Sequence, residues 1–319
     1  MQLVSLATNP VPSGAVVGTF PGYDGLPLRF ARWAATRGPR RGTACLFPGR
    51  GEFIEKYFEV VAELRRRGFA VAILDWRGQG GSARLLADPA KGHVDSFASY
   101  DRDLVRFMKL EVLPDCPPPY VAIAHSMGGN IVLRHATEQG SWFERMVLCA
   151  PMIEIAPALM KAPPGFVRAY AEIGSLIGLA GTYVRGGSGP PIETRPFEGN
   201  LLTTDRARYE RNKAILVQAP ELGLGSPTKG WLRAALRSSA LLLAADYPEE
   251  VKIPALVVSA ANDQMVSVSV IERFASGLKV GTHVSMPLAR HEILQETDAV
   301  RQRFWAVFDA YLNIQQEAA

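Results

Sequence analysis

Short apolar segments alternate with stretches of helical periodicity through the first half and the last quarter of the chain. The short segments are continuously apolar, which is typical of strands buried on both faces of a parallel sheet. They predict eight strands, at Ala15–Phe20, Leu28–Trp33, Thr43–Phe47, Phe69–Leu74, Tyr120–Ala124, Met146–Ala150, Ala255–Ala260 and His283–Met286. The Asp24-Gly25 pair between the first two strands favours a hairpin at that point.

The helical stretches lie between these strands. They predict helices at Tyr57–Arg67, Tyr100–Leu113, Gly128–Gln139, Val268–Leu278 and Asp298–Ile314. Gly68 and Pro114 directly follow the first two of these ranges, and both residue types end helices. Strands that alternate with helices indicate an α/β fold, here a mostly parallel eight-stranded sheet flanked by helices.

The alternation stops between residues 152 and 247. This segment contains several prolines and the loop-like run Gly186–Pro191, and its apolar residues have helical spacing. We expect helices at Lys213–Leu222 and Lys229–Leu243. The sequence therefore predicts a core of residues 1–151 and 248–319, with residues 152–247 inserted between the sixth and seventh strands as a helical cap.

Ser126 lies in the run Ala124-His-Ser-Met-Gly128, between a predicted strand and a predicted helix. A sharp strand-to-helix turn needs small residues two before and two after the serine, and it exposes the hydroxyl above the sheet. Ala124 stands where the usual pattern has glycine. Serine is also a common N-cap, so a structural role is the alternative. The combined context favours Ser126 as the nucleophile of a serine hydrolase with the α/β-hydrolase fold.

A serine nucleophile needs a histidine base and an acid that orients it, in the chain order serine, acid, histidine. Chain order and placement exclude four of the five histidines, His93, His125, His135 and His283. His291 remains, in the loop after the last predicted strand. Asp263 follows the seventh strand, at the edge where parallel sheets hold ligands. A turn aspartate is the alternative reading of Asp263, and Glu292 is a competing acid.

The glycine-containing loop Phe47–Glu52 follows the third predicted strand, where a backbone amide can approach a substrate. We assign the oxyanion-binding amides to Arg50 and Met127. A simple turn is the alternative interpretation of this loop. Gly49 and His125, next to these amides, are expected to contact the substrate.

Composition and charge narrow the range of partners. The chain has 319 residues, and 35 Lys and Arg against 31 Asp and Glu is too even a balance to suggest nucleic-acid binding. The glycine-rich run Asp75–Ser82 lacks a dinucleotide-binding pattern, and we expect neither a metal nor a cofactor. No apolar stretch reaches the roughly 20 residues that span a bilayer, and no signal peptide is recognisable, which favours a cytoplasmic location.

Four blocks carry a resemblance to a known family: Pro48–Tyr57, Asp75–Ser82, His125–Gly129 and Ala289–Leu294. Together with Gly92–Tyr100 and Leu202–Tyr209, they extend over almost the whole chain. The chain resembles the lysophospholipase L2 and monoacylglycerol lipase group of α/β-hydrolases. The resemblance implies esterase chemistry on a single-chain lipid, with Ser126, Asp263 and His291 as the triad and a helical cap that forms the acyl pocket.

Two departures from the group favour its bacterial lysophospholipase-like branch. Pro48 stands where monoacylglycerol lipases usually have histidine, and Ala124 replaces the first elbow glycine. We expect a serine hydrolase that cleaves lysophospholipid or monoacylglycerol esters through an acyl-enzyme. A general carboxylesterase, a peptidase-like acyl hydrolase, an acyltransferase and a non-catalytic binding protein of the same fold are the alternatives.

The cap contains the strongly apolar stretch Phe166–Leu179, in which Leu176 and Ile177 are candidate substrate contacts. An acyl tunnel or peripheral contact with the inner face of a membrane explains such a stretch, and so does packing on the core. Arg168 and Arg185 nearby are candidates to meet a phosphate headgroup. Nothing in the pattern indicates an oligomeric state.

Overall fold

The computed structural model of the chain describes residues 2–36, 40–138 and 140–315. Eight of its strands form one sheet, as the sequence predicts, and their order in the sheet is β1-β2-β4-β3-β5-β6-β7-β8. Their bounds are β1 (Val16–Pro21), β2 (Pro27–Trp33), β3 (Thr43–Phe47), β4 (Ala70–Leu74), β5 (Tyr120–His125), β6 (Phe143–Cys149), β7 (Ala255–Ala260) and β8 (Gly281–Met286).

Only β2 runs antiparallel to the other strands of the sheet. β1 and β2 form the expected hairpin, and β2 also pairs antiparallel with β4. The remaining pairs are parallel, from β4 through β3, β5, β6 and β7 to β8. The carboxyl ends of β3, β5, β7 and β8 therefore meet at one edge, where ligands of α/β sheets bind.

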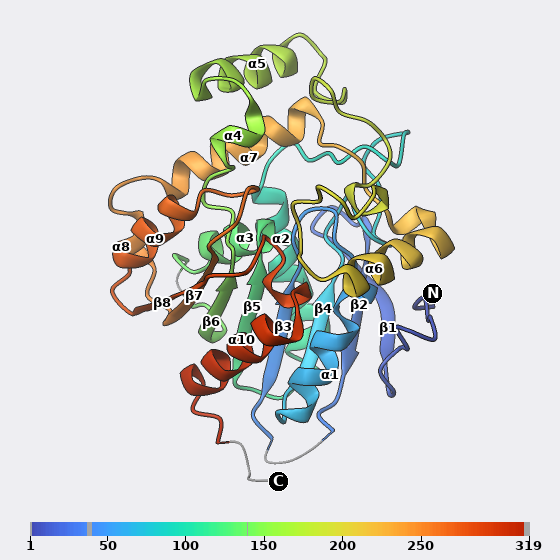
Figure 1. Cartoon of the computed structure of the whole chain (residues 1–319), viewed down its shortest axis with the longest axis vertical. Coiled ribbons are helices and arrows are strands. Elements are labelled where there is room, and N and C mark those ends of the chain that lie inside the picture. The colour runs from blue at the N-terminus through green and yellow to red at the C-terminus, as the bar shows by residue number, and fades with distance from the viewer. Residues whose placement is uncertain (1, 37–39, 139, 316–319) are drawn as a thin grey trace.

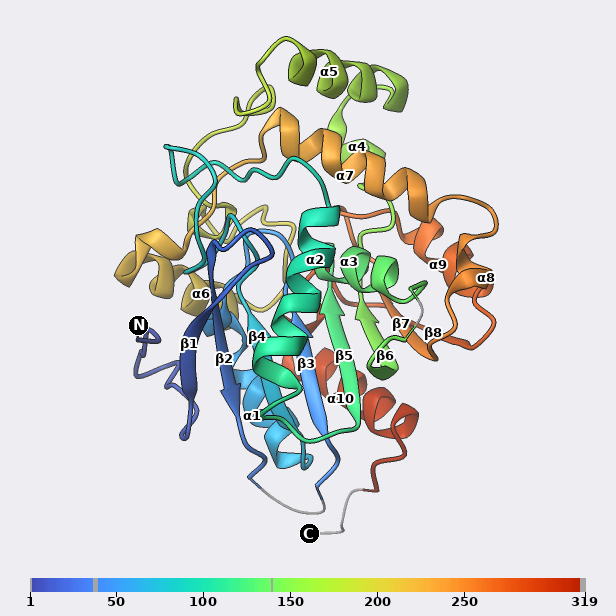
Figure 2. The same cartoon turned by 180° about the vertical axis from the view of Figure 1, so that it is seen from behind.

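Helices cover both faces of the sheet (Figures 1 and 2). One face carries α1 (Phe58–Arg66) and α10 (Asp298–Tyr311), and the other carries α2 (Ala98–Phe107) and α3 (Met127–His135). A π-helical turn at Met108–Val112 extends α2, and α9 (Val268–Ser276) packs on β7 and β8. The predicted end of the third helix at Gln139 lies outside the described residues, and α3 ends at His135.

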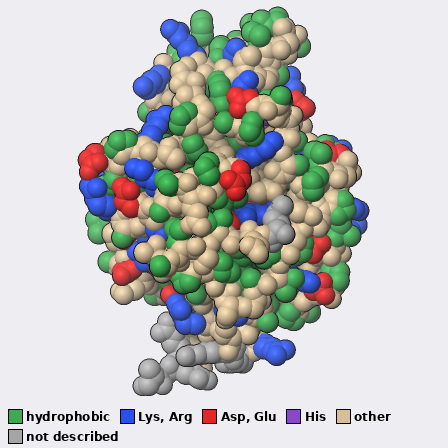
Figure 3. All heavy atoms as spheres, turned by 90° about the vertical axis from the view of Figure 1, so that its right-hand side faces the viewer, with side chains coloured by type: hydrophobic (Ala, Val, Ile, Leu, Met, Phe, Trp, Pro, Cys, Tyr) green, Lys and Arg blue, Asp and Glu red, His purple; other side chains and the backbone are tan. Residues whose placement is uncertain are grey.

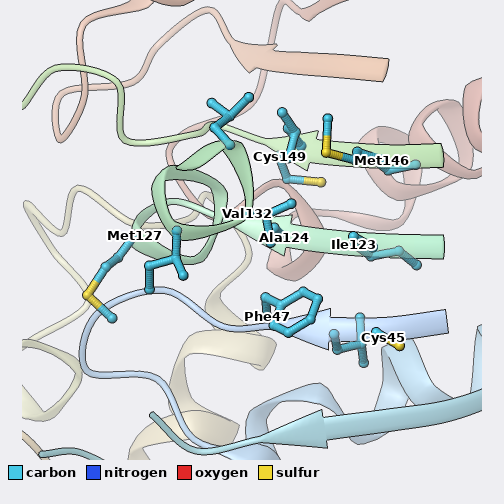
Figure 4. Close-up of a cluster of buried hydrophobic side chains, with 14 of the residues drawn as sticks. Cys45, Phe47, Ile123, Ala124, Met127, Val132, Met146 and Cys149 are labelled. Carbon is cyan, nitrogen blue, oxygen red and sulfur yellow. The ribbon is translucent and has the colours of Figure 1, made fainter. Parts of the chain in front are cut away.

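Part of the core lies between α3 and the central strands (Figure 4). Every residue of β3, β4, β5 and β7 is buried, which accounts for their continuous apolar runs. Phe47, Ile123 and Val132 pack there together with the free thiols of Cys45 and Cys149. Met127 lies beside this cluster at the start of α3, near the loop that follows β3.

The helices between β6 and β7 are α4 (Pro157–Met160), α5 (Pro164–Leu176), α6 (Arg206–Gln218), α7 (Lys229–Leu242) and α8 (Tyr247–Glu250). Most of them lie toward the carboxyl edge of the sheet, whereas α8 lies beside α9 at its side (Figure 1). α7 packs on α3, and α5 packs on the outer side of α7. We call the segment between β6 and β7 the cap. Its division from the core at residues 152 and 247 as a separate domain stays a prediction.

The bounds predicted for one cap helix are wrong. α6 begins at Arg206, not Lys213, because the Asp205 side chain accepts a hydrogen bond from the Arg208 amide and caps the first turn. It ends at Gln218, because Pro220 cannot continue the helix and opens a separate 3₁₀ turn, Pro220–Leu222.

Candidate active site

Ser126 adopts a strained backbone conformation, with φ 51° and ψ −114°. Its amide donates to the Cys149 carbonyl at 3.1 Å, and its carbonyl accepts from the Met152 amide at 2.9 Å. A β-carbon at Gly128 would overlap the carbonyl oxygen of Phe47, so the glycine lets α3 start close to β3. The chain therefore turns sharply from β5 into α3 with Ser126 at the turn, as a nucleophile elbow does.

Three side chains from separate loops form one hydrogen-bonded chain at this turn. Ser126 makes no capping bond to α3; instead its Oγ lies 2.9 Å from Nε2 of His291. Nδ1 of His291 lies 2.7 Å from Oδ2 of Asp263. Because the carboxylate accepts the proton on Nδ1, Nε2 of a neutral His291 is free to accept the serine proton.

Asp263 is ionised and fixed in place. Its Oδ1 accepts hydrogen bonds from the amides of Met265 at 2.7 Å and Val266 at 3.1 Å. Burial would raise the pKa of Asp263, but its interaction and hydrogen bond with His291 and the hydrogen bonds from these amides lower it. The residue thus shapes a turn and also orients the histidine, so both readings of its sequence position apply.

The loop after β3 leaves one amide available beside the nucleophile. The Gly49 amide donates to Oε2 of Glu52, and the Gly51 amide donates to Oε1 of Gln79 at 3.2 Å. The Arg50 amide between them has no hydrogen-bond partner among the described residues. The Met127 amide begins α3, where helix amides lack internal partners.

Gly49 lies directly against the nucleophile. A β-carbon there would be 3.2 Å from Cβ of Ser126 and 3.0 Å from Nδ1 of His125. The backbone of the loop therefore approaches the Ser126 hydroxyl closely, as an oxyanion-binding loop must.

Glu52 and His125 connect the loops of the site. Oε2 of Glu52 accepts from Tyr57 at 2.6 Å and from Nδ1 of His125 at 3.0 Å, in addition to the Gly49 amide. Nε2 of His125 donates to the carbonyl oxygen of His291 at 3.1 Å. The sequence suggested substrate contact for His125, whereas in the structure both its ring nitrogens are bound by protein groups.

Sequence reasoning also missed the role of the glycine-rich block Asp75–Ser82. Nε2 of Gln79 donates to the carbonyls of Gly49 at 2.8 Å and Glu52 at 3.1 Å. Nε1 of Trp76 donates to the Pro48 carbonyl at 2.8 Å. The block is a tight turn, as predicted, and in addition it holds the loop after β3 in place.

A buried lysine joins the active-site loops to the cap. Nζ of Lys56 lies 3.1 Å from Glu52, 2.6 Å from Glu292 and 3.8 Å from Glu193, which belongs to the cap turn Ile192–Thr194. Burial raises the pKa of Glu193 to about 7, against the charge of Lys56. Glu292, the competing acid in the sequence, thus pairs with Lys56 in the structure.

The remaining predicted site residues lie elsewhere. Leu176 and Ile177 are 79% and 65% exposed at the outer end of the cap. His135 stacks on Trp142, and His283 bonds to Ser259 through Nε2 at 2.9 Å. Across the described ranges, no group of three or more His, Cys, Asp or Glu side chains is arranged to hold a metal ion.

A family model described as serine aminopeptidase, S33, matches residues 38–298. The chain belongs to this family of α/β-hydrolases. Within the family, it is 34% identical over 294 residues to lysophospholipase L2 of Escherichia coli K12, covering 88% of this chain and 83% of that protein.

Solved structures share the fold of this serine aminopeptidase family member. A soluble variant of monoglyceride lipase from Saccharomyces cerevisiae, in complex with a substrate analog, has a TM-score of 0.73 at 20% identity, covering 93% of this chain and 96% of that chain. A carboxyl esterase from Bacillus coagulans has a TM-score of 0.71 at 17% identity, covering 95% and 99%. The chain is thus a serine hydrolase family member related to lysophospholipase L2.

Proposed function

We propose that this protein is a serine carboxylic-ester hydrolase that cleaves single-chain lipids, lysophospholipid or monoacylglycerol, through an acyl-enzyme. The observation that carries the proposal is the unbroken hydrogen-bonded chain from Ser126 through His291 to Asp263 at a strained elbow. Side chains in this arrangement activate a serine hydroxyl as a nucleophile.

The proposed reaction has two acyl-transfer steps. Nε2 of His291 takes the Ser126 proton while Oγ attacks the ester carbonyl, and the amides of Arg50 and Met127 bind the oxyanion. The intermediate collapses, the carbon–oxygen bond to the alcohol breaks, and His291 gives its proton to that alcohol. A water molecule then attacks the acyl-enzyme with the same base, and the free acid leaves.

The relatives support the lipid substrate class. Lysophospholipase L2 of Escherichia coli is similar to this chain over most of both sequences. The loop and elbow residues of the site lie within residues 38–298, which the family model matches. At 34% identity this similarity supports the class of substrate. Gly49, against the nucleophile, is the predicted substrate contact whose position fits that role.

The outer face of the cap supports contact with a lipid surface. The helix α5 exposes Phe166 by 77% and Leu176 by 79%, with Ile173 and Ile177 beside them. Figure 3 shows hydrophobic side chains gathered at the end of the molecule that α5 forms. Their outward exposure favours a membrane surface over an acyl tunnel as their partner. No helix in the part of the chain that the structure describes is suited to span a bilayer.

A panel of esters tests the proposal. Native protein is given lysophosphatidylcholine, monoacylglycerol and p-nitrophenyl esters of increasing chain length. We expect turnover of the lipids, with kcat/KM rising with chain length. A preference for two-carbon esters without lipid turnover would make the protein a general carboxylesterase. Aminoacyl amides are included because the matched family is described as a serine aminopeptidase. Their cleavage would make the protein a peptidase.

A further inference from the structure

Arg50 carries a positive charge that no carboxylate of the described residues neutralises. The buried arginines Arg29 and Arg77 each form ion pairs with two carboxylates. For Arg50, no carboxylate oxygen of a described residue lies within ion-pair distance. The carboxylate of Glu193 raises the pKa of Arg50 only through its longer-range electric field. An arginine without a counter-charge is costly inside a protein unless a ligand supplies one.

The Arg50 side chain lies between the loop after β3 and the cap. Its Nη2 donates to the carbonyl of Gly225 at 2.6 Å, and its guanidinium lies 5.1 Å from the ring centroid of Trp231 on α7. Gly92 has no room for a β-carbon because Arg50 lies against it. These contacts hold the guanidinium in one place, but a carbonyl and an aromatic ring only partly offset its charge.

Part of the guanidinium makes no hydrogen bond to the described residues. Nε is buried without a hydrogen-bond partner, and Nη1 donates to no described residue. Burial lowers the pKa of Arg50 to about 10, so the group is still a cation at neutral pH. The residue as a whole is half-buried, so part of its surface is accessible to solvent between the loop after β3 and the cap.

We propose that the Arg50 guanidinium binds a phosphate on the alcohol side of the ester and thereby selects phosphate-bearing single-chain lipids over neutral ones. The inference rests on the proposed ester hydrolase function. The Arg50 amide is the proposed oxyanion donor, so the same residue lies beside the reacting ester. Only the glycerol carbons separate that ester from the phosphate in a lysophospholipid. The planar guanidinium fork matches phosphate geometry.

The test compares two substrates with the same short acyl chain, lysophosphatidylglycerol and monoacylglycerol, below their micelle-forming concentrations. We expect Arg50→Gln to lower the ratio of their kcat/KM values, phosphate-bearing to neutral, by about 10- to 100-fold. Arg50→Lys keeps the charge without the fork, so the ratio falls less. The control Arg206→Gln removes an exposed cap arginine, which pairs with Glu198 on the surface, and is expected to leave the ratio within about twofold.

A folded Arg50→Gln variant with the native ratio would overturn the proposal, as would a native protein that does not favour the phosphate-bearing substrate. An ester with a carboxylate on its acyl chain tests whether Arg50 binds an anion on the acyl side instead. If Arg50→Gln lowered kcat/KM for such esters but not for phosphate-bearing lipids, the proposal would also be overturned. If no ester shows Ser126-dependent turnover, the proposed function itself fails.

Native protein gives an independent measurement should Arg50→Gln not fold. We expect glycerol 3-phosphate to inhibit p-nitrophenyl ester hydrolysis at a concentration at least about tenfold lower than glycerol does. Equal inhibition by the two compounds would contradict a phosphate-binding role for Arg50.

Discussion

His125 holds a positive charge directly behind the nucleophile. One ring nitrogen faces the carboxylate of Glu52 and the other faces the carbonyl oxygen of His291, and neither acceptor has a proton to give. Both ring nitrogens must therefore donate, which requires the imidazolium form. Burial alone would lower the pKa of His125, but the charge of Glu52 and its hydrogen bond raise it. The cation links the loop after β3 to the loop that carries His291.

Replacing this cation is expected to disturb catalysis more than folding. In His125→Phe both hydrogen bonds are lost, so Gly49 and His291 lose a shared support. We expect kcat for a soluble p-nitrophenyl ester to fall by about 10- to 100-fold with little change in KM. His125→Gln keeps one donor and should recover part of the loss.

His135→Phe is the matched control, because His135 is equally buried but stacks on Trp142 away from the site. Thermal unfolding checks that each variant folds. Equal kcat values for His125→Phe and His135→Phe would show that His125 has no positioning role.

The site residues that could be predicted from the sequence are those whose position relative to a neighbouring strand is itself informative. Ser126, Asp263 and His291 each follow a recognisable strand in the expected chain order, and the structure brings them together. Glu52 and Gln79 gave no such signal, because their roles depend on partners that only the folded chain brings near. The glycines of Asp75–Ser82 predict a turn in the chain, but they do not predict which groups the side chains of the turn bind.

The cap helix α5 has an apolar face that no other element covers. Phe166 is 77% and Ile173 57% exposed, while Val167 and Ala171 on the opposite side pack toward α7. A helix with one face buried in protein and the other apolar and exposed is typical of contact with a lipid surface.

We expect the double variant Phe166→Ser, Ile173→Ser to bind phosphatidylethanolamine–phosphatidylglycerol vesicles at least about tenfold more weakly than native protein. The reason is the loss of apolar area that would enter the interface. Sedimentation with vesicles measures the bound fraction. Val217→Ser removes an equally exposed apolar residue from α6, 72% exposed, and should leave binding unchanged. Equal binding by the double variant and native protein would refute membrane contact through α5.

Helical spacing predicted α7 almost to the residue but misplaced α6. The two helices differ in how clearly the sequence marks the residue at which each begins. Thr228 accepts a hydrogen bond from the Trp231 amide and caps α7 where the apolar pattern starts. α6 instead starts at Arg206, after its cap Asp205, in a polar run without apolar periodicity. Outside the apolar stretches, pattern alone does not locate a helix start.

At the scale of the whole molecule, a buried carboxyl connects the cap to the core. Glu193 lies 3.8 Å from Lys56, and burial raises its pKa to about 7 from an ordinary value of 4.5. A carboxyl with a raised pKa binds its proton more tightly in the folded protein. Its contribution to stability is therefore fully present below pH 4.5 and is lost as the pH rises through about 7.

Glu193→Gln should remove this pH dependence. Relative to native protein, the free energy of unfolding of the variant is expected to rise by about 1–3 kcal/mol between pH 5 and pH 8. Urea denaturation at the two pH values measures it. Glu198→Gln is the control, since Glu198 is exposed in the same cap and its pKa is lowered by Arg206. A difference between Glu193→Gln and native protein that is the same at both pH values would contradict the account.

The sheet and its order of elements followed from the alternation of strands and helices, because burial on both faces leaves a strong apolar signal in each strand. The arrangement of the cap over the site did not, because contacts such as Lys56 with Glu193 and Arg50 with Trp231 join segments more than 100 residues apart. These contacts connect the segment after β3 to the cap, and no local sequence pattern predicts them.

Labelling of Ser126 by a fluorophosphonate tests the central claim most directly. The reagent reacts with a serine only when its hydroxyl is activated as a nucleophile. We expect native protein to be labelled at one site, Ser126→Ala to be unlabelled, and His291→Ala to react at least about 1,000-fold more slowly. Labelling of Ser126→Ala at the native rate, or a native protein that is never labelled, would contradict the account.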